Sequence, residues 1–427
     1  MHTPTPASKA FTLVEVMVST AIIGLIMLVL VAMTNQTSAT WRSTTEKIEK
    51  FQEARDGFES MTRRLAQATL NTNWDYLDSN GNPRPTTVNT TNYNSFIPVM
   101  YGRTASLRLI SGPMYSTPKG TALSTDLARP THGIFFQAPF GVMDLSNGQY
   151  AALPTDRNIL GSALNLWGYY VEAGFDKTVP GFVSQVVLSN GQKAVMPRWR
   201  SRLMEFRQPS EAMNLYEPVS NGSRAWYTVP LQNAYATPTD PSVRVLAENI
   251  VALVLMPKLS KSDEDNLKST NSPYQLCPYY IYDSSTTSNP GVSATGSAVA
   301  PINPKNQLPP IVEVTMVAVD ERSAKRLDEK YGTGPNGNGI GSPYMGLDQA
   351  GNKVGVTFTN LFTDQSTGPG TSGTGTPLEG PLGSVTTVTP SDLNSIQQIL
   401  INEKVTYRIF TSNVTIRGAK WSRVQTK

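Results

Sequence analysis

The sequence predicts an α+β protein in which a long N-terminal helix precedes a β-rich head with large loop insertions. Three observations predict this class. An apolar run of 23 residues covers positions 11–33 and contains one charge, which is enough to cross a bilayer as a helix. Residues 34–70 contain no proline and carry apolar side chains at three- and four-residue spacing, as an amphipathic helix does. Downstream, short apolar runs alternate with turn residues, which is typical of strands.

Composition excludes several classes of protein. The chain has 427 residues, a net charge of +4 and a charged fraction of 16%, against roughly 25% in an average globular chain. Disordered and nucleic-acid-coating proteins carry more charge or charge of one sign. A chain of this length forms two domains, or one domain with insertions, because single cores stop growing near roughly 250–300 residues.

Cysteine and histidine are scarce. The lone cysteine, Cys277, forbids an intrachain disulfide or a cysteine zinc cluster. With only His2 and His132, a histidine metal site or a catalytic triad is also hard to build. We expect Cys277 to be a small buried apolar side chain and the chain to have no enzyme activity.

The first element is a polar leader, residues 1–10, whose only formal charge is that of Lys9. The positive-inside tendency places this leader in the cytoplasm. Two interpretations compete for residues 11–33, a cleaved secretory signal and a lasting membrane span. The run is longer than the roughly 7–15 apolar residues of a signal. Glu15 within it costs about 2.5–3.5 kcal/mol on insertion scales, so the span is favoured and Glu15 needs a partner.

Lys9 and Ala10, followed by residues 11–15 (FTLVE) and an unbroken apolar stretch, resemble the class III signal of type IV pilins and type II secretion pseudopilins. The resemblance implies cleavage by a prepilin peptidase between Ala10 and Phe11 and N-methylation of Phe11. It also implies that Glu15, then the fifth residue, serves subunit assembly. A carboxylate in the membrane can be neutralised by the α-ammonium of a neighbouring subunit. The family usually has glycine before the cleaved bond, where this chain has Ala10.

Residues 34–70 extend the membrane helix as an amphipathic segment. We expect the first half of the joined helix to pack in the membrane and the filament core, and the second half to lie against a sheet. The apolar stripe of the extension consists of Trp41, Ile48, Phe51, Ala54, Phe58, Met61, Leu65 and Ala68.

The head is expected to cover residues 71–427, with insertions near 71–94, 283–310 and 332–390 that are rich in Asn, Ser, Thr, Gly and Pro. Residues 313–327 predict a strand running into a short basic helix, and residues 391–402 a second helix. On the strand, Val312, Val314, Met316 and Ala318 would share one face, with Glu313, Thr315 and Val317 on the other. The predicted strands are 106–110, 133–137, 164–175, 183–188, 203–207, 225–231, 249–256, 310–319, 405–411 and 413–417.

Parts of the head sequence make the family resemblance more specific. Residues 246–249 before an apolar strand, and residues 308–314 opening the next, resemble the head strands of the J-type minor pseudopilin of type II secretion. Residues 405–421 resemble its closing hairpin and are close to the set called Verru_Chthon cassette protein C. The resemblance implies a pilin-like fold and a non-catalytic subunit, anchored in the bacterial inner membrane by one span with its head in the periplasm. It implies inner-membrane lipid, prepilin peptidase, a major pseudopilin and I-like and K-like minor subunits as partners.

Two other classes of function stay open. The first is a minor pilin with an adhesive or DNA-binding head, which a basic groove or an aromatic-lined pocket would favour. The second is a membrane-tethered enzyme, which a pocket with convergent carboxylates would favour. A basic stacking surface could form where Arg198, Arg200, Arg202 and Arg207 interleave with aromatic residues. The period-two spacing of the first three of these arginines fits one face of an exposed strand better, so we expect no nucleic-acid partner.

Two acidic segments were compared with calcium sites. Residues 78–82 alternate oxygen ligands, but the position that requires glycine is Pro83 and no glutamate closes the loop, so a turn is the better interpretation. Residues 262–266 form an acidic cluster that could hold Ca²⁺, although a solvated loop is favoured. We therefore predict no metal site and no cofactor, with Ca²⁺ as the one alternative.

Overall fold

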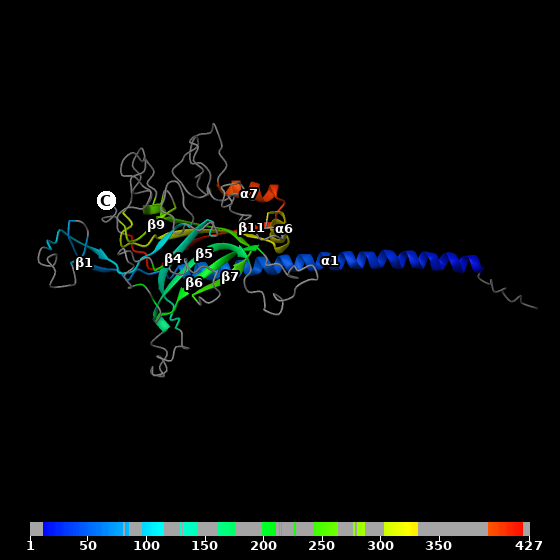
Figure 1. Ribbon diagram of the computed structural model, residues 1–427, viewed down its shortest axis with the longest axis horizontal. Helices are drawn as coiled ribbons and strands as arrows, with labels where there is room; N and C mark the ends of the chain where they lie inside the picture. Colours follow the sequence, from blue (N-terminus) through cyan, green and yellow to red (C-terminus); the bar gives the residue numbers. More distant parts are fainter. Residues whose placement is uncertain are drawn as a thin grey trace, which may run out of the picture. The chain divides into compact units, whose positions relative to one another are not determined.

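A computed structural model provides the structure of the chain. It divides the chain into two compact units, Met1–Lys50 and Phe51–Lys427. An N-terminal apolar helix precedes a β-rich region (Figure 1), which is the predicted α+β arrangement and is consistent with a pilin-like fold. The described residues are 12–79, 82–84, 96–114, 129, 131–143, 161–175, 199–210, 213, 215, 226–227, 242–263, 276–277, 280–286, 303–331 and 392–421.

Helix α1 (Leu13–Leu65) supplies residues to both units and ends five residues before the predicted limit at residue 70. The final turn tightens, because the Ala68 N–H donates to the Leu65 carbonyl at 3.0 Å. The Thr69 N–H then donates to the Gln137 carbonyl at 2.9 Å, as an isolated bridge to a strand. Directly after the helix ends, the chain therefore pairs with a strand of the sheet through Thr69.

The described part of the head contains three antiparallel sheets. The largest has the strand order β7-β6-β5-β4-β3-β9, the second β11-β10-β8, and the third β1-β2. Their bounds are β1 (Asn73–Leu77), β2 (Met100–Thr104), β3 (Ile110–Pro113), β4 (His132–Pro139), β5 (Leu164–Phe175), β6 (Trp199–Gln208), β7 (Val243–Glu248), β8 (Ile250–Lys258), β9 (Tyr282–Asp283), β10 (Ile311–Val319) and β11 (Tyr407–Thr415). Two short helices complete the described head, α6 (Glu321–Tyr331) and α7 (Asp392–Asn402).

Five of the ten predicted strands are confirmed, as β4, β5, β6, β8 and β10, and β5 matches its prediction at both ends. The predicted closing hairpin is wrong, because residues 405–417 contain a single strand, β11, paired with β10 along its whole length. The prediction interrupts the strand at Ser412, but Ser412 and Asn413 each face a β10 residue in register. The prediction of residues 106–110 as a strand is also wrong, since β3 starts at the last of them. Strand β1 lies inside the first predicted insertion.

Two other strand predictions fall largely outside the described residues. Nothing described covers 183–188, and within 225–231 only Trp226 and Tyr227 are described, as a turn. The insertion at 332–390 lies outside the described residues as well. Residue 249 precedes β8 instead of opening it: Asn249 has a positive φ of 60° at the point where the chain passes from the six-stranded to the three-stranded sheet.

The predicted division of β10 between two faces is confirmed, and both of these faces are buried. Val312, Val314, Met316 and Ala318 belong to the main core, which also contains the second half of α1 and residues of the six-stranded sheet. Val317 faces a second core formed with α6 and α7. The three-stranded sheet is therefore a middle layer, with α1 on one side and the short helices on the other.

The apolar stripe of α1 divides at the boundary between the units. Ala54, Phe58, Met61 and Leu65 are buried in the main core, and the Phe58 ring lies 5.9 Å from that of Phe410 on β11. The earlier members of the stripe, Trp41 and Ile48, are exposed. The prediction that the second half of the helix packs on a sheet is therefore confirmed from Phe51 onward.

Candidate functional site

The start of α1 is held by a reciprocal cap. The backbone N–H and the hydroxyl of Thr12 each donate to Oε2 of Glu15, both at 3.0 Å. The Glu15 N–H donates back to the Thr12 hydroxyl at 3.3 Å. This is the capping box, in which a threonine and a glutamate three residues later satisfy each other's helix-end donors. Both of the bonds that Glu15 accepts from Thr12 fall on Oε2, and among the described residues no donor reaches Oε1.

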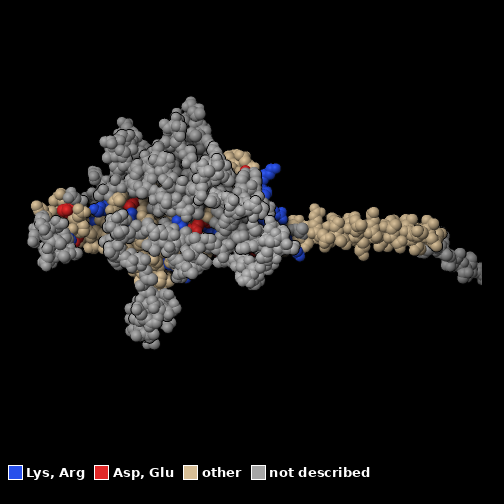
Figure 2. Space-filling view, in the orientation of Figure 1, with Lys and Arg blue, Asp and Glu red and all other residues tan. Residues whose placement is uncertain are grey.

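The helix behind this cap has an apolar surface. Leu13–Arg42 is long and apolar enough to cross a membrane, by length and composition. Every described side chain from Thr12 to Met33 is exposed, and Figure 2 shows this segment as a surface with almost no charge. An exposed apolar surface of this length is favoured in lipid rather than in water.

Hydroxyl side chains within the apolar segment are satisfied by their own helix. The Ser19 hydroxyl donates to the Glu15 carbonyl at 2.6 Å, and the Thr20 hydroxyl to the Val16 carbonyl at 3.0 Å. Bonds of this kind give serine and threonine an acceptor without water, which is what a bilayer interior demands of polar groups. The polar residues of the span are thus compatible with lipid.

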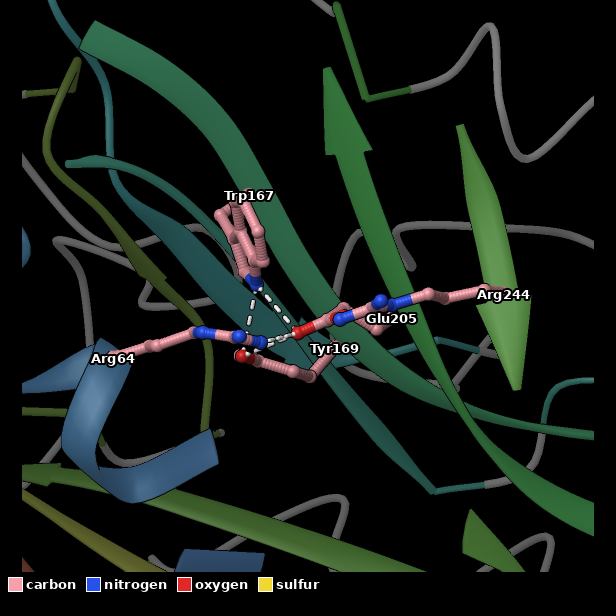
Figure 3. Close-up of polar contacts among 5 residues, drawn as sticks. All are labelled: Arg64, Trp167, Tyr169, Glu205 and Arg244. Atoms are coloured by element: carbon pink, nitrogen blue, oxygen red, sulfur yellow. Dashed lines mark hydrogen bonds and ion pairs between the residues drawn. The ribbon is translucent and has the colours of Figure 1, made fainter. Parts of the chain in front are cut away.

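A second carboxylate lies in the head and is fully enclosed. Glu205 on β6 faces Tyr169 of β5 and Arg244 of β7 directly across the sheet, and Arg64 reaches it from the last turn of α1 (Figure 3). Its Oε1 accepts hydrogen bonds from the Trp167 indole and the Tyr169 hydroxyl, both at 3.0 Å, as well as from Arg64. Its Oε2 accepts from Arg244.

This cluster fixes the helix on the sheet. The Arg64 guanidinium also lies over the Trp167 ring, 4.7 Å from its centroid. A carboxylate has about four lone-pair sites, and the donors around Glu205 occupy them, so this group is unsuited to act as a base or a metal ligand. Burial, followed by the negative charge of Glu205, raises the pKa of Tyr169 well above its ordinary value of 10.0, so the tyrosine stays a neutral donor at physiological pH.

His132 and Cys277 are both buried in the head. His132 is buried and its Nδ1 accepts a hydrogen bond from the Leu255 N–H at 3.0 Å. The Thr131 hydroxyl accepts from the Leu253 N–H at 3.0 Å, so these two side chains bond the outer edge of β8. Cys277 is buried, as predicted, and desolvation raises its thiol pKa well above the ordinary 9.0.

The predicted exposed arginine face is corrected by the structure. Arg200 and Arg202 do lie on a strand, β6, but both are buried. Arg200 donates to Glu321 at the start of α6, at 2.7 Å. The sequence pattern could not show that α6 would cover this strand and supply the counter-charge. Arg198 lies outside the described residues, and Arg207 is half-buried.

The two calcium candidates have different outcomes. Asp78 closes a turn, accepting from the Asn82 N–H at 2.8 Å through Oδ1, in line with the prediction. In the acidic cluster, Asp263 accepts from the Ser260 hydroxyl at 2.6 Å, and residues 264–266 lie outside the described chain. Among the described residues, no group of three or more His, Cys, Asp or Glu side chains could hold a metal ion. The expectation of no cofactor stays a prediction.

Among the predicted site residues, the structure describes Glu15, whereas Ala10 and Phe11 lie outside the described chain. Sequence reasoning missed the capping box, although its signal, a threonine three residues before a glutamate at the start of an apolar run, is visible. It also missed the Glu205 cluster. No local signal marks that cluster, because its members come from one helix and three strands.

Comparison with known proteins gives one finding at the same end of the chain. The family described as the prokaryotic N-terminal methylation motif matches residues 6–31. Neither curated proteins nor solved structures gave a match. The methylation motif supports a pilin-like or pseudopilin subunit, and it implies processing by prepilin peptidase and assembly with other pilins. Together with the single apolar helix, it fits a membrane-anchored pilin.

Proposed function

We propose that this chain is a non-catalytic minor pseudopilin of the J type, which assembles through its N-terminal helix into a type II secretion-like or type IV pilus-like filament. The observation that carries the proposal is a capped glutamate, Glu15, on an exposed apolar helix within the matched methylation motif at residues 6–31. The J-type assignment is supported by the sequence of residues 246–249, which directly precedes β8, and of residues 308–314, which includes the start of β10.

In this proposal the leader is cleaved between Ala10 and Phe11, and Phe11 is then methylated. Alanine is small and fits a cleavage position usually held by glycine. Thr12 remains in the mature chain, so the capping box survives processing. Glu15 can then receive the α-ammonium of a neighbouring subunit at Oε1, while Oε2 keeps its bonds to Thr12. Pairing compensates a carboxylate that is expensive to bury alone.

We also propose a location for the chain and a set of partners. The leader is cytoplasmic, the span crosses the inner membrane once, and the head lies in the periplasm. Inner-membrane lipid surrounds the span before assembly. The head then contacts other members of the filament, namely I-like and K-like minor subunits and the major pseudopilin.

Two substitutions at Glu15 separate the cap from the charge. Glutamine completes a capping box as glutamate does, but it carries no charge. Glu15→Gln should therefore keep the helix start and fail to assemble, as Glu15→Ala does. Glu59→Ala is the matched control, since Glu59 is an exposed glutamate of the same helix whose partner is Arg55.

The measurement combines intact mass and N-terminal sequencing of the membrane-extracted protein with recovery of its pilin-like partners. We expect a mature chain that begins at methylated Phe11, and loss of partners in both Glu15 variants but not in Glu59→Ala. An uncleaved chain, or one beginning near Thr40, would overturn the pseudopilin proposal. Normal assembly of Glu15→Gln would show that the cap, not the charge, is what assembly requires.

A further inference from the structure

Exposed apolar side chains of the head are concentrated on one small sheet. In the described part of the head, two exposed large apolar residues lie elsewhere, Val245 and Ile401. The others all lie on β1, on β2 or just before β2: Trp74, Tyr76, Ile97, Val99, Met100 and Tyr101. Single exposed apolar residues are normal on a protein surface, whereas a cluster marks an interaction site.

The register of β1 and β2 gathers the aromatic residues on one face. Trp74 lies opposite Arg103, and Tyr76 lies opposite Tyr101. The Tyr101 ring is 5.7 Å from the Trp74 ring and 5.3 Å from the Tyr76 ring. The Arg103 guanidinium lies over Trp74, 5.5 Å from the ring centroid. We call these four residues the aromatic face.

The aromatic face is held in place from the side of the strand. The Asn306 side chain donates to the Arg103 carbonyl at 2.7 Å, and the Arg103 guanidinium donates to the Lys420 carbonyl. Across the pair, the Thr104 hydroxyl donates to the Asn73 side chain at 2.9 Å. Two segments far apart in the sequence thus fix β2, so the rings are preorganised and binding loses less conformational entropy.

The charge on this face has one sign. Arg103 is the charged member of the aromatic face. Asp75, between Trp74 and Tyr76 on β1, belongs to the opposite face of the two-stranded sheet. A complementary partner therefore carries acidic side chains around an apolar centre.

We propose that the aromatic face is the docking site for the head of another pilin-like subunit of the same filament. Trp, Tyr and Arg are the residue types that dominate binding energy at protein interfaces. Sugars and nucleobases stack on aromatic rings but gain little from branched aliphatic groups, and here Ile97 and Val99 are 73% and 62% exposed. Those aliphatic side chains favour a protein partner. The inference rests on the proposed function and adds to it the surface through which heads meet.

The test places a photo-crosslinking amino acid, p-benzoylphenylalanine, at Tyr101 of the full chain in its native membrane. Ile401, a similarly exposed apolar residue on α7, is the matched control position. We expect a Tyr101 adduct that mass spectrometry identifies as a second protein with a prepilin-type N-terminus, and no such adduct from Ile401. The paired substitution Trp74→Ser and Arg103→Ser should reduce recovery of that partner roughly 30-fold, as loss of an interface hot spot does.

The contrary outcomes are defined against the proposed function. An adduct only with lipid, nucleic acid or polysaccharide, equal adducts at both positions, or no adduct would overturn the docking site. If Glu15-dependent assembly persists in the same cells, the pseudopilin proposal survives that result. Unchanged denaturant midpoints of the Trp74→Ser and Arg103→Ser chain would show that lost recovery is not a loss of folding.

Discussion

Glu15 lies on an apolar helix and Glu205 is buried in the head, and the two carboxylates obtain their hydrogen-bond donors in different ways. Glu15 accepts hydrogen bonds within its own helix turn, where Thr12 donates to one carboxylate oxygen. Glu205 is surrounded by donors from α1, β5 and β7 that use both oxygens. Folding of the head therefore supplies hydrogen-bond donors to both oxygens of its buried carboxylate. The span leaves one oxygen without a described donor, which is the arrangement expected of a group whose partner comes from another chain.

The sharpest test of this contrast is Glu205→Ala. Removing the carboxylate leaves Arg64 and Arg244 without a counter-charge and the Trp167 and Tyr169 donors without an acceptor. Breaking a buried pair in this way costs about 3–5 kcal/mol. We expect that loss in the free energy of unfolding of the full chain in detergent, measured by denaturant titration of tryptophan fluorescence. Glu15→Ala should leave the free energy of unfolding close to the wild-type value, because Glu15 is exposed and its described contacts stay within one helix turn. Equal effects would remove the distinction between the two carboxylates.

A second test compares two apolar residues of the same stripe on α1. Met61 has no exposed surface in the main core, whereas Trp41 is 73% exposed. Met61→Ala should lower the free energy of unfolding by about 2–4 kcal/mol through lost contacts and the cavity left behind. Trp41→Ala should leave it within about 0.5 kcal/mol. The same denaturant titration measures both, and a large loss for Trp41→Ala would mean that the head buries more of the helix than Phe51 onward.

A third test uses pH, because the buried ionisable groups belong to the head. Burial raises the pKa of the Cys277 thiol and of the Tyr282 hydroxyl well above their ordinary values of 9.0 and 10.0. Above those values the unfolded chain loses protons that the folded chain keeps. The contribution of the two groups to the free energy of unfolding is therefore fully present below about pH 9. As pH rises above the ordinary pKa of each group, the free energy of unfolding falls by about 1.4 kcal/mol per pH unit for that group.

The control for the pH series is Cys277→Ala. It removes the group with the lower ordinary pKa, so the loss of stability should begin near pH 10 instead of pH 9. Unfolding midpoints from pH 7 to pH 11 measure the onset. A chain whose stability is flat to pH 11 would contradict the burial of these groups.

The sequence predicted the parts of this protein that local patterns encode. Hydropathy gave the span, three-and-four spacing gave the buried face of α1, and period-two alternation gave β10 with its two faces. The Glu205 cluster and the burial of Arg200 were not predictable in this way. Their stabilising partners lie between 36 and 141 positions away in the sequence, on other strands and helices, and only the fold brings them together.

The aromatic face shows the same limit at the surface. Trp74 and Tyr101 come from a segment that composition assigned to an insertion and from a strand that was not predicted. An Asn- and Thr-rich context suggested a loop, but cross-strand pairing of the rings stabilises a short sheet there. The candidate assembly residue Glu15 was predictable because its signal is contiguous in the sequence.

The smallest expected effect concerns Arg55, whose Nε donates to Glu59 at 2.8 Å. Both side chains are at least half exposed, at 68% and 50%, so water screens the pair. The basic residue precedes the acidic one, which is the weaker order on a helix. We expect Arg55→Ala to lower the free energy of unfolding only slightly, and the difference from wild type to vanish in 1 M salt, where the Debye length is about 3 Å. Glu205→Ala should keep most of its effect in the same salt, because its partners enclose it. A loss for Arg55→Ala as large as that for Glu205→Ala would mean that position on α1, rather than burial, sets the strength of its ion pairs.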